Sequence, residues 1–368
     1  MNDTRFPAVV VTLLLVTTGV AMTGVGASLP ADPSDAARTN QVDAGAACGY
    51  ASLYDRTIDS VVAIRTGDGL GSGFAYRVAD DGSAFFVTNA HVVGEASNVQ
   101  VQFAREESRM GTVVGNDTFS DLAVVRVDDT PDYVDPLPVA DEPPQHGEKV
   151  AAVGNPFGLE GTITHGIVSG TNRSMPTTLG FTIPDVVQTD APINPGNSGG
   201  PLLSCDGTVI GVNTAGITAS EAENIGFSVS ASAVRTVVPE LIDDGEFEHT
   251  FLGIGTARAT PQLLEANGFD ATGGVYVHEV YADAPANGTL QGTTETVLVD
   301  GEQVPVGGDL IVAIDGQSVG SNEALASYLF TETRPGDEVT LTVLRDGDQQ
   351  NVTVTLGERP SPEDADRS

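Results

Sequence analysis

The stretch DAPINPGNSGGP, residues 190–201, places one hydroxyl-bearing side chain, Ser198, among glycines. A serine hydroxyl becomes a strong nucleophile only when a neighbouring base accepts its proton and an acid orients that base. The sequence offers both groups at the ends of apolar segments: His91 follows the strand-like run FFVTNA, and Asp121 precedes LAVVRV. These residue types predict nucleophilic serine chemistry, with His91 as the base, Asp121 as its orienting acid and Ser198 as the nucleophile.

Each of these signals is weak when it is taken alone. A glycine-rich turn, a histidine after a strand and an aspartate before a strand all have common structural roles. The chain order His–Asp–Ser is more specific, because it is the order of the double-barrel serine proteases and differs from that of subtilisins and α/β-hydrolases. The other histidines lack comparable surroundings, and we interpret them as structural: His146, His165, His249 and His278.

The glycines around Ser198 have a chemical reason to be there. The transition state of acyl transfer develops an oxyanion, which preorganised backbone N–H groups stabilise. The GNSGG stretch can direct the amides of Gly196 and Ser198 into one pocket, and a side chain at position 196 would obstruct that turn. We therefore predict an oxyanion hole in the loop formed by Gly196, Asn197 and Ser198.

Short strands dominate residues 51–230, and these strands must position the reactive groups. Runs such as SVVAIR, GSGFAYRV, EKVAAVG and TVIGVNTAG are separated by clusters of Gly, Pro, Asn and Asp, which is typical of an all-β barrel or sandwich. The spacing of Val234, Val237, Val238 and Leu241 predicts a helix that closes this first domain. We place the domain at residues 49–245.

A second unit follows, which we place at residues 250–358. It combines the strands GGVYVHEV, DLIVAIDG, EVTLTVLRDG and QNVTVTLG with one helix, SNEALASYLFTET, for which Ser321 is a suitable N-cap. We expect the tail, residues 359–368, to be disordered. The predicted fold class is therefore mainly β, with a small number of helices.

The N-terminal segment, residues 1–29, contains a long run without charged residues after Arg5. About 20 apolar residues suffice to span a bilayer, so this segment is either a cleaved secretory signal or a membrane anchor. Residues 30–48 are small and polar, which predicts a flexible linker. We expect an exported protein, either secreted or anchored in the membrane at the cell surface, with its active domain outside the cytoplasm.

The charge balance is strongly acidic, because 51 Asp and Glu residues against 16 Lys and Arg residues give the 368-residue chain a formal net charge of −35. Nucleic-acid binding needs a basic face, so the composition argues against that class of function. Repulsion among so many carboxylates destabilises a compact chain unless salt screens it. We therefore expect a protein adapted to high salt, and our hypothesis for its source is a halophilic archaeon.

The chain contains two cysteines, Cys48 and Cys205. In an exported protein they can form a disulfide that ties the segment before the first strand to the segment after GNSGGP. The alternative is two small buried thiols. Two cysteines and five scattered histidines do not predict a metal site. Serine acyl-transfer chemistry also requires no metal or organic cofactor.

Five motifs, taken in order, resemble those of the HtrA (Deg) family of serine proteases: TNAHVV, SDLAVVRV, GNPFGLEGTITHGIVSG, QTDAPINPGNSGGPLL and GVNTAG…NIGFSVS. The later motifs FLGI and GGDLIVAIDG are similar to those of the family's PDZ domain. The resemblance covers residues 50–357. It implies a chymotrypsin-like double β-barrel with the active site between the barrels, one PDZ domain, and a homotrimer built through the N-terminal segment. Tyr50 and Tyr54 are our candidates for that contact.

Substrate preference can be argued from the same resemblance. A trypsin-like enzyme of this fold needs a carboxylate six residues before the nucleophile, where this chain has Pro192. Ile225, Gly226 and Phe227 match the family strand that pairs with an extended substrate, and they would shape an apolar pocket. We expect a preference for small aliphatic residues in unfolded polypeptides.

In the PDZ-like unit, the residues Phe251, Leu252, Gly253 and Ile254 match the loop that receives the carboxylate of a C-terminal peptide. The alternative is a β-rich accessory domain that binds no ligand. Residues 291–307 form an insertion relative to the family core. This insertion leaves open whether the peptide groove is accessible.

The leading hypothesis is a serine endopeptidase that acts outside the cytoplasm on unfolded or misfolded proteins, in protein quality control and stress response, under the control of its PDZ domain. One alternative is a peptide-binding chaperone with weak or absent proteolysis. Another is a membrane-tethered sensor with low basal activity that cuts one regulatory protein after peptide binding. By resemblance, residues 169–184 and 214–226 would transmit activation.

Overall fold

The computed structural model describes residues 48–67, 69–155, 161–177, 180–214 and 225–360. The predicted export segment (1–29), residues 30–47 of the predicted linker and residues 361–368 of the predicted tail lie outside the described residues. Most of the predicted activation segment 214–226 lies outside them as well. Within the described ranges, no helix combines the length and the apolar composition that a membrane-spanning helix needs.

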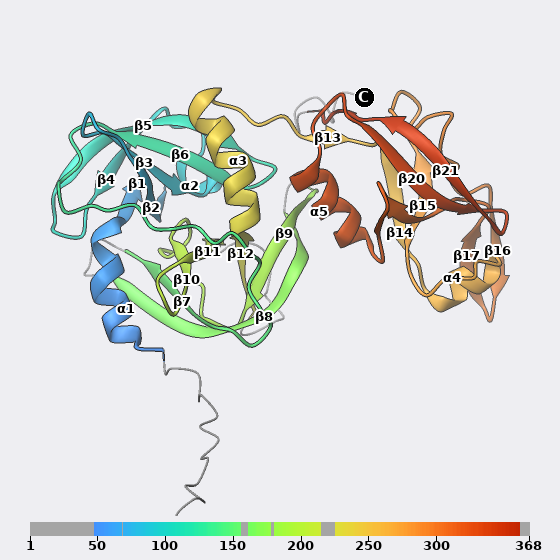
Figure 1. Ribbon diagram of the computed structural model, residues 1–368, viewed down its shortest axis with the longest axis horizontal. Helices are drawn as coiled ribbons and strands as arrows, with labels where there is room; N and C mark the ends of the chain where they lie inside the picture. The colour runs from blue at the N-terminus through green and yellow to red at the C-terminus, as the bar shows by residue number, and fades with distance from the viewer. Residues whose placement is uncertain (1–47, 68, 156–160, 178–179, 215–224, 361–368) are drawn as a thin grey trace, which may run out of the picture. The chain divides into compact units, whose positions relative to one another are not determined.

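Two closed antiparallel barrels form the first part of the described chain (Figure 1). The first barrel has the strand order β1-β2-β3-β6-β5-β4, and the second has the order β10-β11-β12-β9-β8-β7. The bounds of the first barrel's strands are β1 Val61–Arg65, β2 Leu70–Val78, β3 Ala84–Thr88, β4 Asn98–Gln102, β5 Ser108–Asp117 and β6 Leu122–Val127. Those of the second are β7 Lys149–Gly154, β8 Thr162–Pro176, β9 Thr182–Thr189, β10 Pro201–Ser204, β11 Val209–Thr214 and β12 Gly226–Ser230.

The continuous apolar runs of the sequence arise because several strands are buried on both faces. In β6, Leu122 and Val124 belong to a core shared by the two barrels, whereas Val125 and Val127 fill the interior of the first barrel. Successive side chains of a strand point to opposite faces, so a strand with two buried faces reads as apolar throughout. This packing confirms the predicted double β-barrel.

The helix predicted at the end of this domain is α3, Ala231–Asp243. Ser230 caps it by accepting a hydrogen bond from the amide of Ala233, at 3.0 Å. The four residues whose spacing predicted the helix are fully buried in the core shared by the barrels: Val234, Val237, Val238 and Leu241. The helical periodicity therefore identified both the element and its buried face.

Four short helical segments have no counterpart among the predicted elements: α1 (Tyr50–Thr57), the 3-10 helix η1 (Ile58–Ser60), α2 (Ala90–Val93) and α4 (Pro261–Ala266). Helix α1 buries only Leu53 and Thr57 along its own length. It is held by its surroundings, because Cys48 forms a disulfide with Cys205 and Arg56 donates a hydrogen bond to the carbonyl of Cys205. Such a helix leaves almost no periodic signal.

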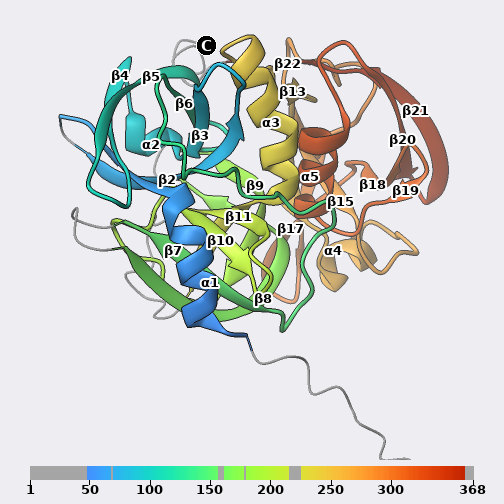
Figure 2. The ribbon, with the colours of Figure 1, turned by 60° about the vertical axis from the view of Figure 1, so that its left-hand side comes forward.

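The C-terminal part of the described chain is a separate antiparallel sheet with the order β14-β15-β18-β20-β21, and β19 pairs with β18. Its helix α5 (Asn322–Glu332) is capped by Ser321 as predicted, and it contacts α3 and β9 (Figure 2). The remaining bounds are β13 Thr250–Phe251, β14 Ile254–Arg258, α4 Pro261–Ala266, β15 Val275–Val280, β16 Glu295–Val299, β17 Glu302–Val306, β18 Leu310–Ile314, β19 Gln317–Ser318, β20 Glu338–Arg345, β21 Asp348–Thr355 and β22 Gly357–Glu358.

The insertion at residues 291–307 folds largely as a β-hairpin of β16 and β17. Its Val304 is buried in a small core with Leu263 and Leu264 of α4 and with Tyr276 of β15. The hairpin thus covers α4 and forms its own two-stranded sheet. The structure gives this insertion a packing partner, which its sequence did not identify.

Candidate active site

The loop after β3 and the turn before β6 bring His91 and Asp121 together. His91 lies in α2, and its Nδ1 atom lies 2.9 Å from each carboxylate oxygen of Asp121. The backbone amide of His91 also donates to Asp121 Oδ1, at 3.1 Å. An ionised carboxylate only accepts hydrogen bonds, so Nδ1 carries the proton and the Nε2 atom of a neutral ring is left as an acceptor.

Asp121 is fixed by further contacts from both barrels. Thr214, at the end of β11, donates its hydroxyl to Asp121 Oδ2 at 2.9 Å. The side-chain amide of Asn89 donates to the carbonyl of Asp121, at 2.9 Å. Asp121 itself has a φ of +56°, which is uncommon for a residue other than glycine. The sequence placed Asp121 before a strand, but it gave no sign of Thr214 or Asn89 as partners.

The pKa of His91 is set by opposing effects of its surroundings. Burial of the ring lowers the pKa, whereas the hydrogen bond and the negative charge of Asp121 raise it, and together they outweigh burial. The pKa of His91 is therefore raised above its ordinary value. About 45% of the His91 side chain is exposed to solvent, so a reacting group can reach the ring.

The loop of Ser198 is tied to the elements that carry His91 and Asp121. The carbonyl of Ser198 accepts a hydrogen bond from the amide of Ser72 in β2, at 2.7 Å, and the carbonyl of Ser72 accepts one from Thr88 at the end of β3. On the other side, the amide of Gly199 donates to the carbonyl of Asn213, which precedes Thr214. Short chains of hydrogen bonds therefore connect the three predicted reactive segments.

Glycine is required at two positions of this loop. Gly196 has a φ of +110°, in the region that favours glycine. Gly199 has a φ of +80°, and a Cβ atom there would lie 2.2 Å from the carbonyl oxygen of Ser72. The backbone of this loop thus packs directly on β2, in agreement with the expectation that a side chain at Gly196 would obstruct the turn.

Ser72, whose buried hydroxyl fixes the same loop, has no signal in the sequence that predicts this role. Ser72 Oγ donates to the carbonyl of Gly196 at 2.6 Å and accepts from the amide of Asn155 at 2.8 Å. In the sequence, Ser72 belongs to the strand-like run GSGFAYRV, which predicts only a strand residue at this position. The close packing of Gly199 and Gly200 against Ser72 is the signal that could have identified it, but this signal appears only in three dimensions.

Asn197 differs from the expectation that it belongs to the oxyanion hole with Gly196 and Ser198. Its backbone amide donates to the carbonyl of Asn194, at 3.1 Å. Its side chain accepts from the amide of Asn194 and donates to the carbonyl of Pro192. Asn197 therefore uses its hydrogen-bonding groups to shape the loop.

The residues predicted to contact substrate lie around the same loop. Ile225 is exposed, whereas Gly226 and Phe227 begin β12. A Cβ atom on Gly226 would lie 2.6 Å from Ile193, the residue after Pro192. The structure thus brings the predicted substrate strand and the segment at Pro192 into contact, and Pro192 offers no carboxylate there.

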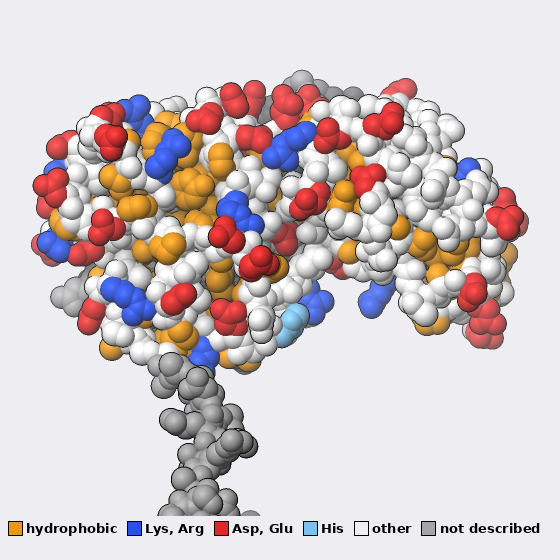
Figure 3. Space-filling model, viewed as in Figure 1, with side chains coloured by type: hydrophobic (Ala, Val, Ile, Leu, Met, Phe, Trp, Pro, Cys, Tyr) orange, Lys and Arg blue, Asp and Glu red, His pale blue; other side chains and the backbone are white. Residues whose placement is uncertain are grey.

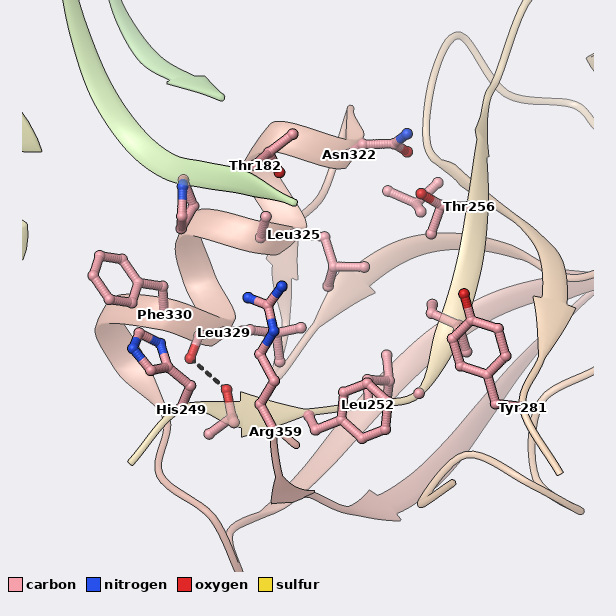
Figure 4. A pocket seen from close by; sticks show the side chains of 17 residues that line it. Thr182, His249, Leu252, Thr256, Tyr281, Asn322, Leu325, Leu329, Phe330 and Arg359 are labelled. Carbon is pink, nitrogen blue, oxygen red and sulfur yellow. Dashed lines mark hydrogen bonds between the residues drawn. The ribbon is translucent and has the colours of Figure 1, made fainter. Parts of the chain in front are cut away.

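The FLGI segment lines a groove of about 350 Å³ in the C-terminal sheet domain, as Figure 4 shows. Residues 251–254 form one end, and Leu325 and Leu329 of α5 form an apolar side. Thr182 and Pro184 of β9 also line this groove. In the described part of the chain, no residue of the insertion 291–307 lines it, so the hairpin leaves the groove uncovered.

Two further predictions concern the N-terminal end of the described chain. Cys48 and Cys205 form a disulfide. Tyr50 stacks on His165 of β8 with ring centroids 4.5 Å apart, and Tyr54 donates its hydroxyl to the carbonyl of Gly161, so both tyrosines contact their own second barrel. No group of three or more His, Cys, Asp and Glu side chains in the described ranges could hold a metal ion.

Comparison with known domain families gives two matches. Residues 71–212 match the trypsin-like peptidase domain, and residues 250–356 match the PDZ domain. The first match contains His91 and Asp121 as well as Ser198. The second contains the FLGI segment and the whole sheet of the C-terminal part.

Whole-chain comparisons find similar proteins in bacteria and plants. The chain is 39% identical to the chloroplastic Protease Do-like 1 of Arabidopsis thaliana, over 79% of this chain and 64% of the relative. It is 33% identical to the periplasmic pH-dependent serine endoprotease DegQ of Escherichia coli, over 78% of this chain and 59% of the relative. The chain thus covers less than two thirds of the length of either relative.

A solved structure is similar over nearly its whole length. It is an HtrA-type protease, AlgW, determined with a tripeptide. It has a TM-score of 0.68 and 33% sequence identity to this chain, and the match covers 85% of this chain and 98% of that one. The likeness therefore includes both the double barrel and the C-terminal domain.

Proposed function

The chain belongs to the family of HtrA-type serine proteases, and on this premise we propose that it is a serine endopeptidase with Ser198 as its nucleophile. This proposal is carried by the hydrogen-bond network that joins the Ser198 loop to the segments of the chain on which His91 and Asp121 lie. It is the arrangement that serine acyl transfer requires: a base beside an orienting acid, and a nucleophile held on a fixed loop. We also propose the division into a protease domain, residues 49–245, and a PDZ domain, residues 250–358.

Each group has one role in the proposed reaction. Nε2 of His91 accepts the proton of Ser198 Oγ as this oxygen forms a bond to the substrate carbonyl carbon. The same nitrogen then returns the proton to the leaving amine, and water releases the acyl group in a second step. Asp121 holds the ring with Nε2 available, and the amides of Gly196 and Ser198 stabilise the oxyanion.

The proposed substrates are unfolded polypeptides with small aliphatic residues at the cleavage site. An extended substrate needs a free backbone, which a folded protein does not offer. The strand β12 pairs with β11 on one edge and with β9 on the other, so Phe227 cannot also pair with a substrate strand as the resemblance implied. The exposed Ile225 is apolar, and Pro192 supplies no carboxylate that would bind Lys or Arg. Both features favour an apolar substrate residue at the cleavage site over Lys or Arg.

The proposed regulator is a peptide with a free C-terminal carboxylate, bound in the PDZ groove. The backbone of residues 251–254 would receive the carboxylate, and the apolar side chains of α5 would contact the last residues of the peptide. Since Thr182 and Pro184 of the second barrel line the same groove, a bound peptide would contact the protease domain as well. This contact favours a regulated protease over an independent binding domain.

We propose that the protein works outside the cytoplasm, in protein quality control. The Cys48–Cys205 disulfide supports an oxidising compartment, and DegQ of Escherichia coli is a periplasmic relative. The segment at residues 1–29 would direct export, whether it is cleaved or retained as an anchor. A homotrimer built through the N-terminal segment is part of the same proposal.

We also propose that the protein requires high salt. Figure 3 shows carboxylate side chains spread over the visible face, with fewer Lys and Arg side chains between them. The net charge of −35 means that the carboxylates repel one another and destabilise the folded chain. Salt screens this repulsion and so stabilises the fold. A fold that is equally stable in dilute and in molar salt would contradict this proposal.

The decisive test compares wild type with Ser198→Ala in molar salt, with reduced casein as an unfolded substrate. We expect wild type to cleave casein, and Ser198→Ala to lose activity by about 10⁶-fold while it melts at the same temperature. Cleavage by both proteins would contradict the assignment of Ser198. If neither folded protein cleaves but both prevent casein from aggregating, the chaperone function is favoured instead.

A further inference from the structure

Asp117 shapes the turn that carries Asp121. It ends β5, and its side chain is only 6% exposed. Its two carboxylate oxygens accept hydrogen bonds from the amides of Phe119, at 3.2 Å, and Ser120, at 3.0 Å. Asp121 follows at once with a φ of +56°, a backbone conformation that persists only where the surrounding structure holds it. The turn from Asp117 to Asp121 is therefore held from within by one carboxylate.

His249 binds that carboxylate from a distant part of the chain. Its Nε2 atom lies 3.0 Å from Oδ1 and 2.9 Å from Oδ2 of Asp117, and only 7% of the His249 side chain is exposed. Since an ionised carboxylate only accepts hydrogen bonds, Nε2 is the donor. His249 lies in the segment between α3 and β13 that joins the two domains. This segment is thereby attached to the turn of Asp121.

Aromatic rings hold His249 in place on several sides. The ring stacks on Phe330 of α5, with centroids 5.6 Å apart and an interplanar angle of 7°. Phe119, from the turn itself, and Phe247 meet it edge-on, with centroid distances of 5.2 and 4.8 Å. The amide of Arg359 donates to the carbonyl of His249, at 2.8 Å. A ring held in this way has little freedom to leave its hydrogen bond.

Helix α5 connects this cluster to the peptide groove. Leu325 and Leu329 line the groove from α5, and Phe330 follows directly beside His249, as Figure 4 shows. Thr250, the residue after His249, donates its hydroxyl to the carbonyl of Leu329, at 2.8 Å. A peptide that shifts α5 would therefore displace a helix in direct contact with His249.

We propose that His249 is a positioning residue for Asp121. Its hydrogen bond to Asp117 keeps the turn from Asp117 to Asp121 in the conformation that places Asp121 against His91, and α5 couples the groove to this bond. The coupling to the groove rests on the peptide binding proposed above. The positioning role is independent of it.

Three variants distinguish a role of His249 in positioning Asp121 from a role in the stability of the fold alone. His249→Leu removes the donor and keeps an apolar side chain among the aromatic rings, whereas His249→Gln retains an N–H donor near the position of Nε2. Arg334→Gln is the matched control, because it removes the hydrogen bonds of Arg334 to Glu240 of α3, another contact between the domains, and leaves Asp117 untouched. Steady-state cleavage of a short aliphatic peptide is measured per folded molecule, with folding checked by circular dichroism.

We expect His249→Leu to lower kcat by about 10- to 100-fold with little change in KM, because a misplaced Asp121 impairs proton transfer and leaves substrate binding intact. His249→Gln should recover most of the loss, and Arg334→Gln should keep the wild-type kcat. A wild-type kcat per folded molecule in His249→Leu would overturn the proposal. Equal losses in the Leu and Gln variants would also overturn it, since the hydrogen bond would then not be the cause.

The coupling is tested with a decapeptide that ends in three valines and a free carboxylate, and with its C-terminal amide as the control. Binding is followed by fluorescence anisotropy, and kcat is measured at saturating peptide. We expect the peptide to change kcat in wild type but not in His249→Leu, although both bind it. A wild-type response in His249→Leu, or binding without any response in wild type, overturns the coupling. Absence of binding in wild type refutes the proposed peptide function and the coupling with it, while the kcat comparison still decides the positioning role.

Discussion

Two aspartate–histidine pairs begin at the same turn, and their difference shows which of them meets the requirements of the proposed catalytic pair. Asp121 binds His91 and Asp117 binds His249, each with an oxygen–nitrogen distance of 2.9 Å. The distance therefore does not distinguish them. The histidine of the first pair is 45% exposed, whereas that of the second is 7% exposed and enclosed by aromatic rings.

The ring nitrogen that contacts the carboxylate also differs. His91 uses Nδ1, which leaves Nε2 for a nucleophile, whereas His249 uses Nε2 itself. A general base must present a free nitrogen to the proton it accepts. The first pair meets this requirement, and the second meets the requirements of a structural support: a buried donor, a buried acceptor and full packing around both.

Among the experiments that compare the two pairs, we expect the largest effect from the same substitution made in each pair. Asp121→Asn should lower kcat/KM by about 10⁴-fold, because the amide no longer fixes the required tautomer of His91. Asp117→Asn should lower it by only about 10-fold, through a small displacement of the turn. Both are measured on the same peptide substrate per folded molecule. Similar losses in the two variants would show that the pairs do not differ in function as we infer.

A smaller effect is expected when the support of Asp121 is removed. Thr214→Val replaces the hydroxyl that donates to Asp121 Oδ2 with a methyl group of similar size. A hydrogen bond to a charged group contributes about 1.5–3 kcal/mol, so we expect a loss of about 10-fold or more in kcat. Thr214→Ser keeps the donor and should stay close to wild type. If the Ser variant is as impaired as the Val variant, packing rather than the hydrogen bond is the cause.

Much of the fold and part of the candidate site could be predicted, because the elements that form them have a local pattern in the sequence. The strand runs named in the sequence analysis, α3 and α5 follow from alternation, helical spacing and a serine cap, and the structure confirms these elements. The pairing of His91 with Asp121 could be inferred from chain order, because both residues sit at strand ends of a recognisable fold. Their catalytic roles remain a proposal.

The parts that could not be predicted depend on contacts between distant residues. His249 was interpreted as structural without a partner, since nothing in the sequence relates it to Asp117, which is 132 residues away. Helix α1 is held by a disulfide and by contacts with the second barrel rather than by its own periodicity. Ser72 looked like an ordinary strand residue, although its hydroxyl fixes Gly196.

The smallest expected effect is a displacement of the midpoint of the kcat/KM–pH profile from the ordinary pKa of histidine. This midpoint tests whether His91, and not His249, takes part in the proton transfer. In the proposed mechanism His91 must be neutral to accept the proton of Ser198, so we expect kcat/KM to rise with pH through the pKa of His91. Burial lowers this pKa, but Asp121 raises it by more, so the midpoint should lie above the ordinary value of about 6.5. His249→Leu should lower the height of this profile and leave its midpoint in place, because His249 takes no part in the proton transfer.

The loss of the proton from His91 should also change protein stability. As pH rises, we expect activity to increase and the stabilisation by the His91–Asp121 pair to decrease. A histidine whose pKa is raised in the folded state stabilises the fold fully below its unfolded-state pKa, and this contribution is lost as pH rises through the folded-state value. Urea unfolding of wild type and Asp121→Asn across this range would measure it as a difference that shrinks towards high pH. An activity midpoint at or below 6.5 would mean that burial outweighs Asp121, and the contrast between an accessible reactive pair and a buried supporting pair would then need another physical basis.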